Sequence, residues 1–343
     1  MDIAKRLLPN TIRRTAREYQ VSRSIRHLSG PRRISFGEDE AVVTCVLRNG
    51  EYYVDEFIQH YLRMGFRHIF LLDNGSTDRT VDLAAKHSQV TLFQSTLPIH
   101  GRQGLFKKYL ATRCVAQGWC LDVDVDEFFE YPLSSRLTLC GLLTYFNNRN
   151  FTIMLTYMLD MVSAGRPVAS PVVSNKWLRA AYEYYDISDI RRVPYRDDEI
   201  SKCYGMNNIL PDGGGELYFG GIRKKLFGSR FRDCLLTKHS LFKTSCGLDL
   251  FRHVHFVDGG RIADVSGVLL HYKLTDNALA CAEQNRDRFK QNAEYYEDMI
   301  RVLRADTQRE SVNDATVRLR SIDQLVDSGF LFASDVYRSH TTQ

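Results

Sequence analysis

Three aspartates alternate with valines in one short segment of the chain, at positions 122, 124 and 126. If residues 119–125 form a strand, this alternation places all three carboxylates on the same face. Like charges on a buried face are costly without a cation, and carboxylate oxygens are the ligands that Mg²⁺ and Mn²⁺ prefer. We therefore predict a divalent cation at this segment. The alternative is an exposed strand with solvated aspartates, but the aromatic residues that flank the segment argue against it.

A second polar segment, residues 73–78, follows an apolar run at 68–72. Its asparagine and glycine favour a turn, and Ser76 or Thr77 can cap the helix that follows. Asp73 lies where the strand ends, so its carboxylate is a candidate acceptor for a ribose hydroxyl or a base N–H. Ligands of parallel sheets bind beyond the carboxyl ends of the strands, which is where these polar residues are expected.

The elements that must position these residues follow an alternating order. Apolar runs predict strands at 41–47, 68–72, 90–93 and 119–125. Helical periodicity predicts intervening helices at 51–64, 80–87 and 105–117. This alternation with short connections indicates an α/β fold with a parallel sheet. The second half is less regular, with predicted strands at 152–159, 235–243 and 261–272, loops between 160 and 232, a long helix at 276–303 and a helical tail from about 306.

The composition is that of an ordinary globular protein, with 343 residues of which 44% are hydrophobic and 25% charged. The net charge of +5 is modest for this length, and we expect no nucleic-acid partner. No apolar run approaches the roughly 20 residues that span a bilayer. The eight cysteines contain no C-x-x-C pair and no apolar signal sequence opens the chain, so we expect reduced thiols and a cytoplasmic location.

The first 33 residues contain nine Lys and Arg against only two acidic residues. Apolar residues recur among them at roughly helical spacing, although Pro9 interrupts any single helix. A basic amphipathic segment can lie on an anionic membrane, where each cation contributes about 1 kcal/mol. We therefore predict a basic arm at 1–38 that contacts the inner face of the membrane peripherally. The alternative is a solvated basic arm without a membrane role.

Several motifs together resemble the family-2-like glycosyltransferases of GT-A fold, in the branch with a D-x-D-E-F motif. The first half contributes residues 47–57, His60-Tyr61, Gly65, Asp73-Asn74-x-Ser76-x-Asp78 and residues 124–128. The second half contributes Gly220-Gly221-x-Arg223, Phe227, Lys238, His255 and residues 269–273. The resemblance spans roughly residues 40 to 300, and it is the order of the motifs that makes it specific.

The resemblance implies a role for each matching position. Asp122-x-Asp124 has the same spacing as Asp124-x-Asp126, but the Glu127-Phe128 that follows places the motif on Asp124 and Asp126. These two aspartates and His271 are implied to hold Mn²⁺ or Mg²⁺. The implied contacts to the nucleotide sugar are Arg48, Asn49, Glu51, Asp73, Asn74, Asp124, Arg223 and Lys273.

The implied fold is a GT-A, Rossmann-like, mostly parallel sheet flanked by helices, with a helical C-terminal extension. The expected domains are the arm at 1–38, a transferase domain at 39–275 with a nucleotide half at 39–130 and an acceptor half at 131–275, and the extension at 276–343.

The expected activity is metal-dependent, inverting transfer of a sugar from a nucleotide-sugar donor to a glycan or glycoconjugate acceptor, as in polysaccharide biosynthesis. Inversion requires a general base, and Glu216, Asp249 and His255 are the candidates. One alternative is a nucleotidyltransferase on a similar fold, although no glycine-rich triphosphate loop follows the first strand. The other is a catalytically inactive, membrane-associated binding protein, which the paired Asp124 and Asp126 disfavour.

Overall fold

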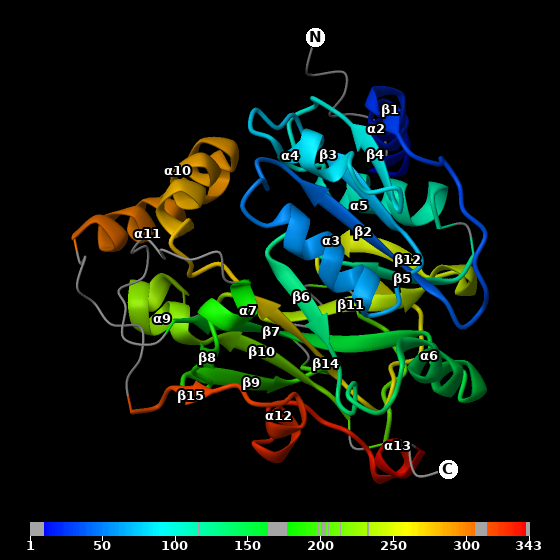
Figure 1. Ribbon diagram of the computed structural model, residues 1–343, viewed down its shortest axis with the longest axis vertical. Coiled ribbons are helices and arrows are strands. Elements are labelled where there is room, and N and C mark those ends of the chain that lie inside the picture. Colours follow the sequence, from blue (N-terminus) through cyan, green and yellow to red (C-terminus); the bar gives the residue numbers. More distant parts are fainter. Residues whose placement is uncertain are drawn as a thin grey trace.

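The computed structural model describes residues 10–115, 117–163, 177–197, 199, 204, 206–212, 214–231, 233–305 and 314–340 (Figure 1). Its centre is a large mixed sheet with the strand order β1-β4-β3-β2-β5-β11-β7-β14-β6. The strands of this path are β1 (Arg26–Ser29), β2 (Ala41–Leu47), β3 (Ile69–Asp73), β4 (Val90–Gln94), β5 (Trp119–Asp122), β6 (Glu127–Glu130), β7 (Ile153–Val162), β11 (Thr237–Lys243) and β14 (Gly267–His271). Two short strands, β8 (Tyr184–Tyr185) and β15 (Val317–Arg318), continue from β7 off this path.

The first half of the sheet is parallel and covered on both faces. Strands β4, β3, β2 and β5 pair in parallel, and every residue of β2 is buried. Alternate β2 residues pack on one side against α3 (Val54–Arg63) and α4 (Thr80–Ala84), and on the other against α5 (Gln103–Arg113). A parallel sheet needs such cover on both faces, which explains the continuous apolar run in β2. The predicted α/β class, with a central sheet flanked by helices, is confirmed.

The second half of the sheet brings distant segments beside β5. Strand β11 pairs antiparallel with both β5 and β7, and β14 pairs parallel with β7 and antiparallel with β6. Residues near positions 122, 160, 238 and 271 therefore lie on neighbouring strands although the sequence separates them widely.

Several predicted boundaries differ from the observed ones. The strand predicted over 119–125 ends at Asp122. The single helix predicted at 276–303 is two helices, α10 (Ala278–Arg288) and α11 (Ala293–Ala305), because Phe289 adopts a non-helical backbone with φ −113° and ψ 65°. Strand β1 lies inside the predicted basic arm and pairs antiparallel with β4.

The remaining elements surround this sheet (Figure 1). The helices are α2 (Asn10–Ser24), α6 (Leu139–Asn148), α7 (Leu178–Ala181), α9 (Ile222–Phe227), α12 (Asp323–Asp327) and α13 (Asp335–His340). Two further two-stranded antiparallel sheets are β9 (Ile190–Pro194) with β10 (Glu216–Gly220), and β12 (Asp249–His253) with β13 (Phe256–Asp258). Within the described ranges, no helix has the length and apolar character that crossing a bilayer requires.

Candidate functional site

A closed turn carries the aspartates of the D-x-D-E-F segment. After β5 ends, the chain turns over residues 124–127, where the Glu127 amide donates to the Asp124 carbonyl at 3.0 Å. The Glu127 carboxylate accepts from the Asp124 amide at 2.9 Å, which closes the turn a second time. The Asp124 amide, which a longer β5 would use to pair with a neighbouring strand, is occupied by this second bond. The three aspartates therefore do not share one strand, but Asp124 and Asp126 project from a rigid turn at its end.

Asp122 is buried in the interior, where Lys107 of α5 neutralises it. The Lys107 Nζ lies 2.6 Å from Asp122 Oδ2, and Thr44 Oγ1 donates to Oδ1 at 3.3 Å. Burial raises the pKa of Asp122 to about 6 and Lys107 limits that rise, so the carboxylate is ionised at pH 7. Asp122 thus has a structural partner, and it is an internal anchor for β5 and α5.

Asp124 lies between two buried lysines. Its Oδ1 is 3.3 Å from Lys107 Nζ and its Oδ2 is 3.0 Å from Lys238 Nζ. Lys238 of β11 also donates to Glu127 Oε1 at 2.6 Å. Burial opposes ionisation of Asp124, but the two ammonium groups outweigh it and hold the pKa of this carboxyl well below its usual value. Both oxygens of Asp124 are therefore already in contact with positive charge.

His271 connects the second aspartate of the motif to the middle of the sheet. Pairing places Glu127, His271 and Asp160 side by side on β6, β14 and β7. His271 Nδ1 donates to Asp160 Oδ1 at 2.6 Å, and Nε2 lies 3.4 Å from Asp126 Oδ2. Burial lowers the pKa of His271, yet the two carboxylates outweigh burial and raise it to about 9.

The donor set of Asp126 and His271 fits a divalent cation. A metal-binding histidine commonly donates its other ring N–H to a carboxylate, as Nδ1 does to Asp160, and Nε2 then points at the metal. Metal binding requires loss of the Nε2 proton, which the cation itself promotes. No group of three or more His, Cys, Asp or Glu within the described ranges forms a complete metal site. Mg²⁺ in phosphate-transferring sites is usually held by one or two carboxylates together with substrate phosphates, so an incomplete protein shell is expected.

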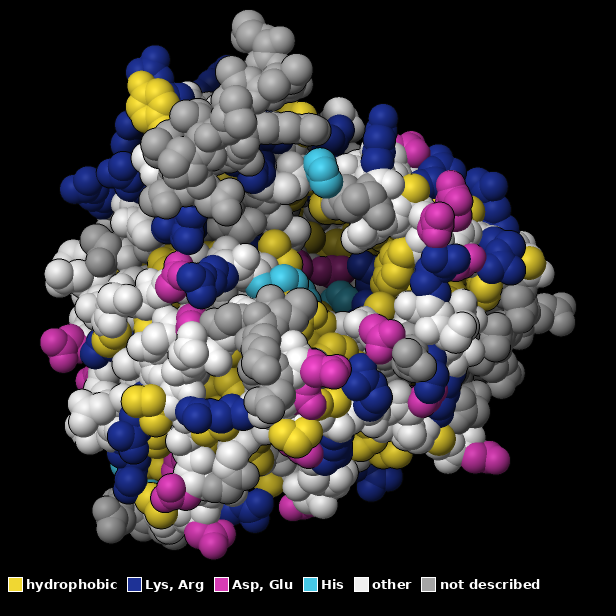
Figure 2. All heavy atoms as spheres, turned by 180° about the vertical axis from the view of Figure 1, so that it is seen from behind, with side chains coloured by type: hydrophobic (Ala, Val, Ile, Leu, Met, Phe, Trp, Pro, Cys, Tyr) yellow, Lys and Arg dark blue, Asp and Glu magenta, His cyan; other side chains and the backbone are white. Residues whose placement is uncertain are grey.

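Positive side chains surround a cavity of about 640 Å³ at this turn. Arg223 donates from Nε to Asp160 Oδ2 at 2.8 Å, and Lys273 lies two residues beyond His271, where β14 ends. Two lining residues hold buried nitrogens that have no hydrogen-bond partner within the described part of the chain, Arg223 Nη2 and His255 Nδ1. An unpaired buried N–H costs about 1–3 kcal/mol, so a bound anion that accepts from Arg223 would recover this loss. Figure 2 shows a hollow in the middle of one face, with acidic and histidine side chains inside it.

The predicted nucleoside contacts lie at the ends of β2 and β3, where several of their side chains are hydrogen-bonded to neighbouring residues. The Asp73 carboxylate is fully buried and accepts from the Gly75 and Ser76 amides and from Gln94 Nε2. These bonds hold the turn after β3 in place. The Asn74 side-chain amide donates to the Ser95 carbonyl at 2.7 Å.

Helix α10 covers these strand ends. Asn49, in the left-handed region at φ 51°, donates from its side chain to Gln284 of α10 at 3.1 Å. Arg288 at the end of α10 donates to Asn74 Oδ1 at 3.2 Å. Arg48 lines a small cavity of about 280 Å³ against the same helix. Glu51 is directed away from it and accepts from the Arg79 amide at 3.0 Å.

The three base candidates lie in different places. Glu216 begins β10 and lies 3.7 Å from the exposed Arg192. Asp249 begins β12 and pairs with Arg14 and Arg252 at 3.2 and 3.0 Å. Neither is among the described residues that line the cavity, whereas His255 is. Burial, together with Lys238 and His253, holds the pKa of His255 well below its usual value, so its imidazole is neutral at pH 7.

Two residues of the site, Lys107 and Asp160, were not predicted from the sequence, although the sequence around each of them indicates a buried charge. Lys107 shares a helical face with the apolar Leu110 and Ala111, three and four residues later, and such a lysine is buried with a partner. Asp160 is the one charged residue in the ten-residue strand β7, all of which is buried. A lone charge in such a strand indicates an ion pair.

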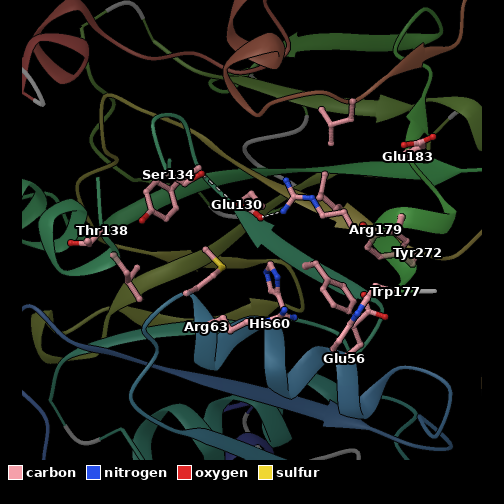
Figure 3. A pocket seen from close by; sticks show the side chains of 17 residues that line it. Glu56, His60, Arg63, Glu130, Ser134, Thr138, Trp177, Arg179, Glu183 and Tyr272 are labelled. Atoms are coloured by element: carbon pink, nitrogen blue, oxygen red, sulfur yellow. Dashed lines mark hydrogen bonds and ion pairs between the residues drawn. The ribbon is translucent and has the colours of Figure 1, made fainter. Parts of the chain in front are cut away.

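A second cavity, of about 720 Å³, lies where Phe128 and Glu130 point, on the opposite face of β6 from Glu127 (Figure 3). Glu130 pairs with Arg179 at 2.5 Å and accepts from Ser134 at 3.3 Å. Glu130 and Arg179 therefore neutralise one another, and none of the three aspartates lines this cavity. The cavity at the D-x-D-E-F turn is the better candidate for the active site.

Comparisons with known proteins give only distant likenesses. No protein-family model matches the chain, and no match emerges among curated proteins. Among solved structures, TarS of S. aureus shares 18% identity over 41% of this chain and 24% of its own, with a TM-score of 0.28. Glucosyl-3-phosphoglycerate synthase of Mycobacterium tuberculosis, solved with Mn²⁺, UDP and glucosyl-3-phosphoglycerate, shares 16% identity over 35% of this chain and 44% of its own, with a TM-score of 0.24. HddC of Yersinia pseudotuberculosis shares 9% identity over 71% of this chain and 98% of its own, with a TM-score of 0.33.

The chain thus spans less than half the length of the first two proteins. With TM-scores below 0.5, these superpositions carry no argument about function, which rests on the site and on the sequence motifs.

Proposed function

We propose that the protein is a GT-A glycosyltransferase that transfers a sugar from a nucleotide-sugar donor to a glycan or glycoconjugate acceptor, with Mn²⁺ or Mg²⁺ as its cofactor. One observation carries the proposal. Asp126 faces His271, which Asp160 orients from behind, and His271 lines a cavity together with Lys238, Arg223 and Lys273. The resemblance of the D-x-D-E-F segment to family-2-like glycosyltransferases supports the same conclusion.

The departing diphosphate is the group that this cavity must stabilise. Negative charge develops on the leaving oxygen as the bond to the anomeric carbon breaks, and fixed cations lower the energy of that state. Arg223 and Lys273 are the side chains that we assign to the diphosphate. Arg223 suits the role because Asp160 fixes its orientation through Nε, while Nη2 has no partner within the described ranges.

We assign the cation to Asp126 and His271. Bound there, Mn²⁺ or Mg²⁺ would supply positive charge beside the leaving group. Asp124 has both oxygens in contact with Lys107 or Lys238, so we assign it to the electrostatic support of the site in this arrangement. Lys238 also pairs with Glu127, which keeps the turn that carries Asp126 in place.

Of the three candidates, we propose His255 as the general base. It lines the cavity and holds an Nδ1 that has no hydrogen-bond partner within the described ranges. In the proposed single displacement, the acceptor hydroxyl gives its proton to His255 while its oxygen bonds to the anomeric carbon. The bond from that carbon to the diphosphate oxygen breaks with its electron pair leaving on the diphosphate, which inverts the configuration.

Thermal unfolding with nucleoside diphosphates tests the proposal directly. UDP, GDP and TDP are compared with the metal present and after chelation. A ligand at a hundred times its dissociation constant stabilises the fold by about 2.7 kcal/mol, so we expect a clear rise in melting temperature for one of them with Mn²⁺ only. Asp126→Asn is expected to remove this rise, whereas the internal Asp122→Asn keeps it. Equal stabilisation after chelation, or none with any nucleotide, contradicts the proposal.

A further inference from the structure

A third cavity, of about 720 Å³, opens beside the proposed active site between α2, the start of α5 and β12. It shares His253, Val254 and Asn292 with the proposed active site, so the two cavities adjoin. Its wall includes Arg14 and Arg17 of α2, which lie in the basic arm predicted at residues 1–38.

An ion-pair network fixes most of the cations at this wall. Glu18 pairs with Arg14 at 3.3 Å and with Lys108 at 2.9 Å. Asp249 pairs with Arg14 at 3.2 Å and with Arg252 at 3.0 Å. Burial would raise the pKa of Glu18, but Lys108 and Arg14 outweigh it and hold this pKa below its usual value. The network is therefore charged at neutral pH. Asp249 is therefore explained as the residue that ties α2 to β12.

Arg17 adds a cation outside this network. It donates to the carbonyl of Gly101, and no carboxylate within the described ranges pairs with it. Gly101 has φ +62°, and a Cβ there would lie 3.0 Å from Arg17 Nη2, so a glycine admits this contact. With Arg17, four cations line the cavity. The two carboxylates that pair with them, Glu18 and Asp249, are not among the described lining residues.

The charge and the geometry suit a phosphate group. The two positive charges in excess match the charge of about −1.5 to −2 on a phosphate monoester at pH 7. One guanidinium group can donate two parallel hydrogen bonds to two phosphate oxygens. Because the ion-pair network already orders most of these long side chains, binding costs less entropy. The donor diphosphate is already assigned to Arg223 and Lys273 in the adjoining cavity, so the cations of this cavity are left for a second anion.

We propose that this cavity is an acceptor subsite and that it binds a phosphate group carried by the acceptor, either a phosphorylated saccharide or a lipid headgroup. The proposal rests on the function proposed above. It gives the N-terminal basic helix a defined role, because α2 forms one wall of a cavity that adjoins the proposed active site. Figure 2 shows Lys and Arg side chains gathered at one edge of the face that holds the hollow.

Titration calorimetry with glucose 6-phosphate tests the subsite, with glucose as the neutral comparison. We expect glucose 6-phosphate to bind, glucose not to bind, and affinity to fall with rising salt. Arg17→Gln is the first variant, because Arg17 stands outside the network and its loss leaves α2 tied down. We expect it to weaken binding about tenfold. Arg113→Gln, at the far end of α5, removes the same charge from an exposed position and should bind as the parent does.

The outcomes separate the two proposals. Nucleotide diphosphate binding with Mn²⁺ is measured on the same samples. If the nucleotide binds but glucose 6-phosphate does not, or if Arg17→Gln binds it as tightly as the parent, the subsite is overturned and the proposed function stands. If glucose 6-phosphate binds through Arg17 but no nucleotide binds, the cavity is an anion site without an acceptor role, and this too overturns the inference.

Cosedimentation with vesicles distinguishes the source of the phosphate. Where glucose 6-phosphate binds, binding to phosphatidic acid vesicles that is lost in Arg17→Gln and absent with phosphatidylcholine supports a lipid-linked acceptor. Binding to glucose 6-phosphate without vesicle binding supports a soluble phosphorylated acceptor. Vesicle binding that Arg17→Gln leaves unchanged contradicts a headgroup in this cavity.

Discussion

Replacement of Lys107 by methionine tests whether the buried Asp122 and the neighbouring Asp124 depend on an internal cation. Lys107 Nζ lies 2.6 Å from Asp122 and 3.3 Å from Asp124. At an effective dielectric constant of 20, two unit charges 2.6 Å apart attract by about 6 kcal/mol, and part of this is spent on desolvation. Breaking a buried pair by removing one partner typically costs about 3–5 kcal/mol, because the other charge stays buried. We expect Lys107→Met to destabilise the protein by that amount.

Asp122→Asn should lower the free energy of unfolding by less than Lys107→Met does. In Asp122→Asn, Lys107 keeps Asp124 as a charged partner, so we expect a loss of about 1–3 kcal/mol. The double variant Lys107→Met with Asp122→Asn should be more stable than the sum of the two losses predicts, because it leaves no unpaired charge at position 122.

Urea unfolding measures these differences through the midpoint and the slope. Lys108→Gln is the matched control, since this neighbouring lysine pairs with Glu18 near the surface and should change stability by less than about 1 kcal/mol. A stability of Lys107→Met within about 1 kcal/mol of the parent, or a larger loss in Asp122→Asn than in Lys107→Met, refutes the reasoning.

Two further predictions concern the interior. Burial lowers the pKa of His239 from 6.5 to about 4, so the unfolded chain takes up this proton first and stability is lost as pH falls from 6.5 towards 4, by on the order of 3 kcal/mol in total. In His239→Gln, the free energy of unfolding should fall less steeply over this range in urea titrations, and an unchanged slope contradicts the assignment. A Cβ at Gly267 of β14 would lie 2.6 Å from a ring carbon of Phe129 on β6, so Gly267→Ala should lower stability by about 1–3 kcal/mol. Gly37→Ala, where the nearest atom is 3.6 Å away, should be nearly neutral in the same thermal unfolding experiment, and equal effects at both positions count against this account.

The elements that local pattern determines were predictable from the sequence. Strand β2 was predicted at 41–47 and found there, because seven consecutive residues that are all buried allow little else in a covered parallel sheet. The end of β5 was not predictable, since it depends on a hydrogen bond from the Asp124 amide to the side chain of Glu127. The break between α10 and α11 was likewise hidden, because it depends on the backbone of one residue, Phe289.

The candidate site was likewise predictable only in part. Its acidic residues were visible as a spaced motif, but their partners come from distant segments. Asp160 and His271 are 111 residues apart and meet only because β7 and β14 pair in parallel. Lys238 reaches Asp124 across 114 residues through the antiparallel pairing of β11 with β5. Without strand order, no spacing rule could show that two of the three aspartates are held by lysines.

Metal-dependent hydrolysis of a nucleotide sugar in three aspartate variants tests the central claim most directly. The donor is the one whose nucleotide stabilises the protein, and release of nucleoside diphosphate is followed with Mn²⁺ present. We predict that Asp124→Asn and Asp126→Asn each lower the rate by about a hundredfold or more, while circular dichroism shows an intact fold. Asp122→Asn should keep most of the activity, because its carboxylate is an internal partner of Lys107. Full activity in Asp126→Asn, or its loss in Asp122→Asn alone, contradicts the proposed metal site.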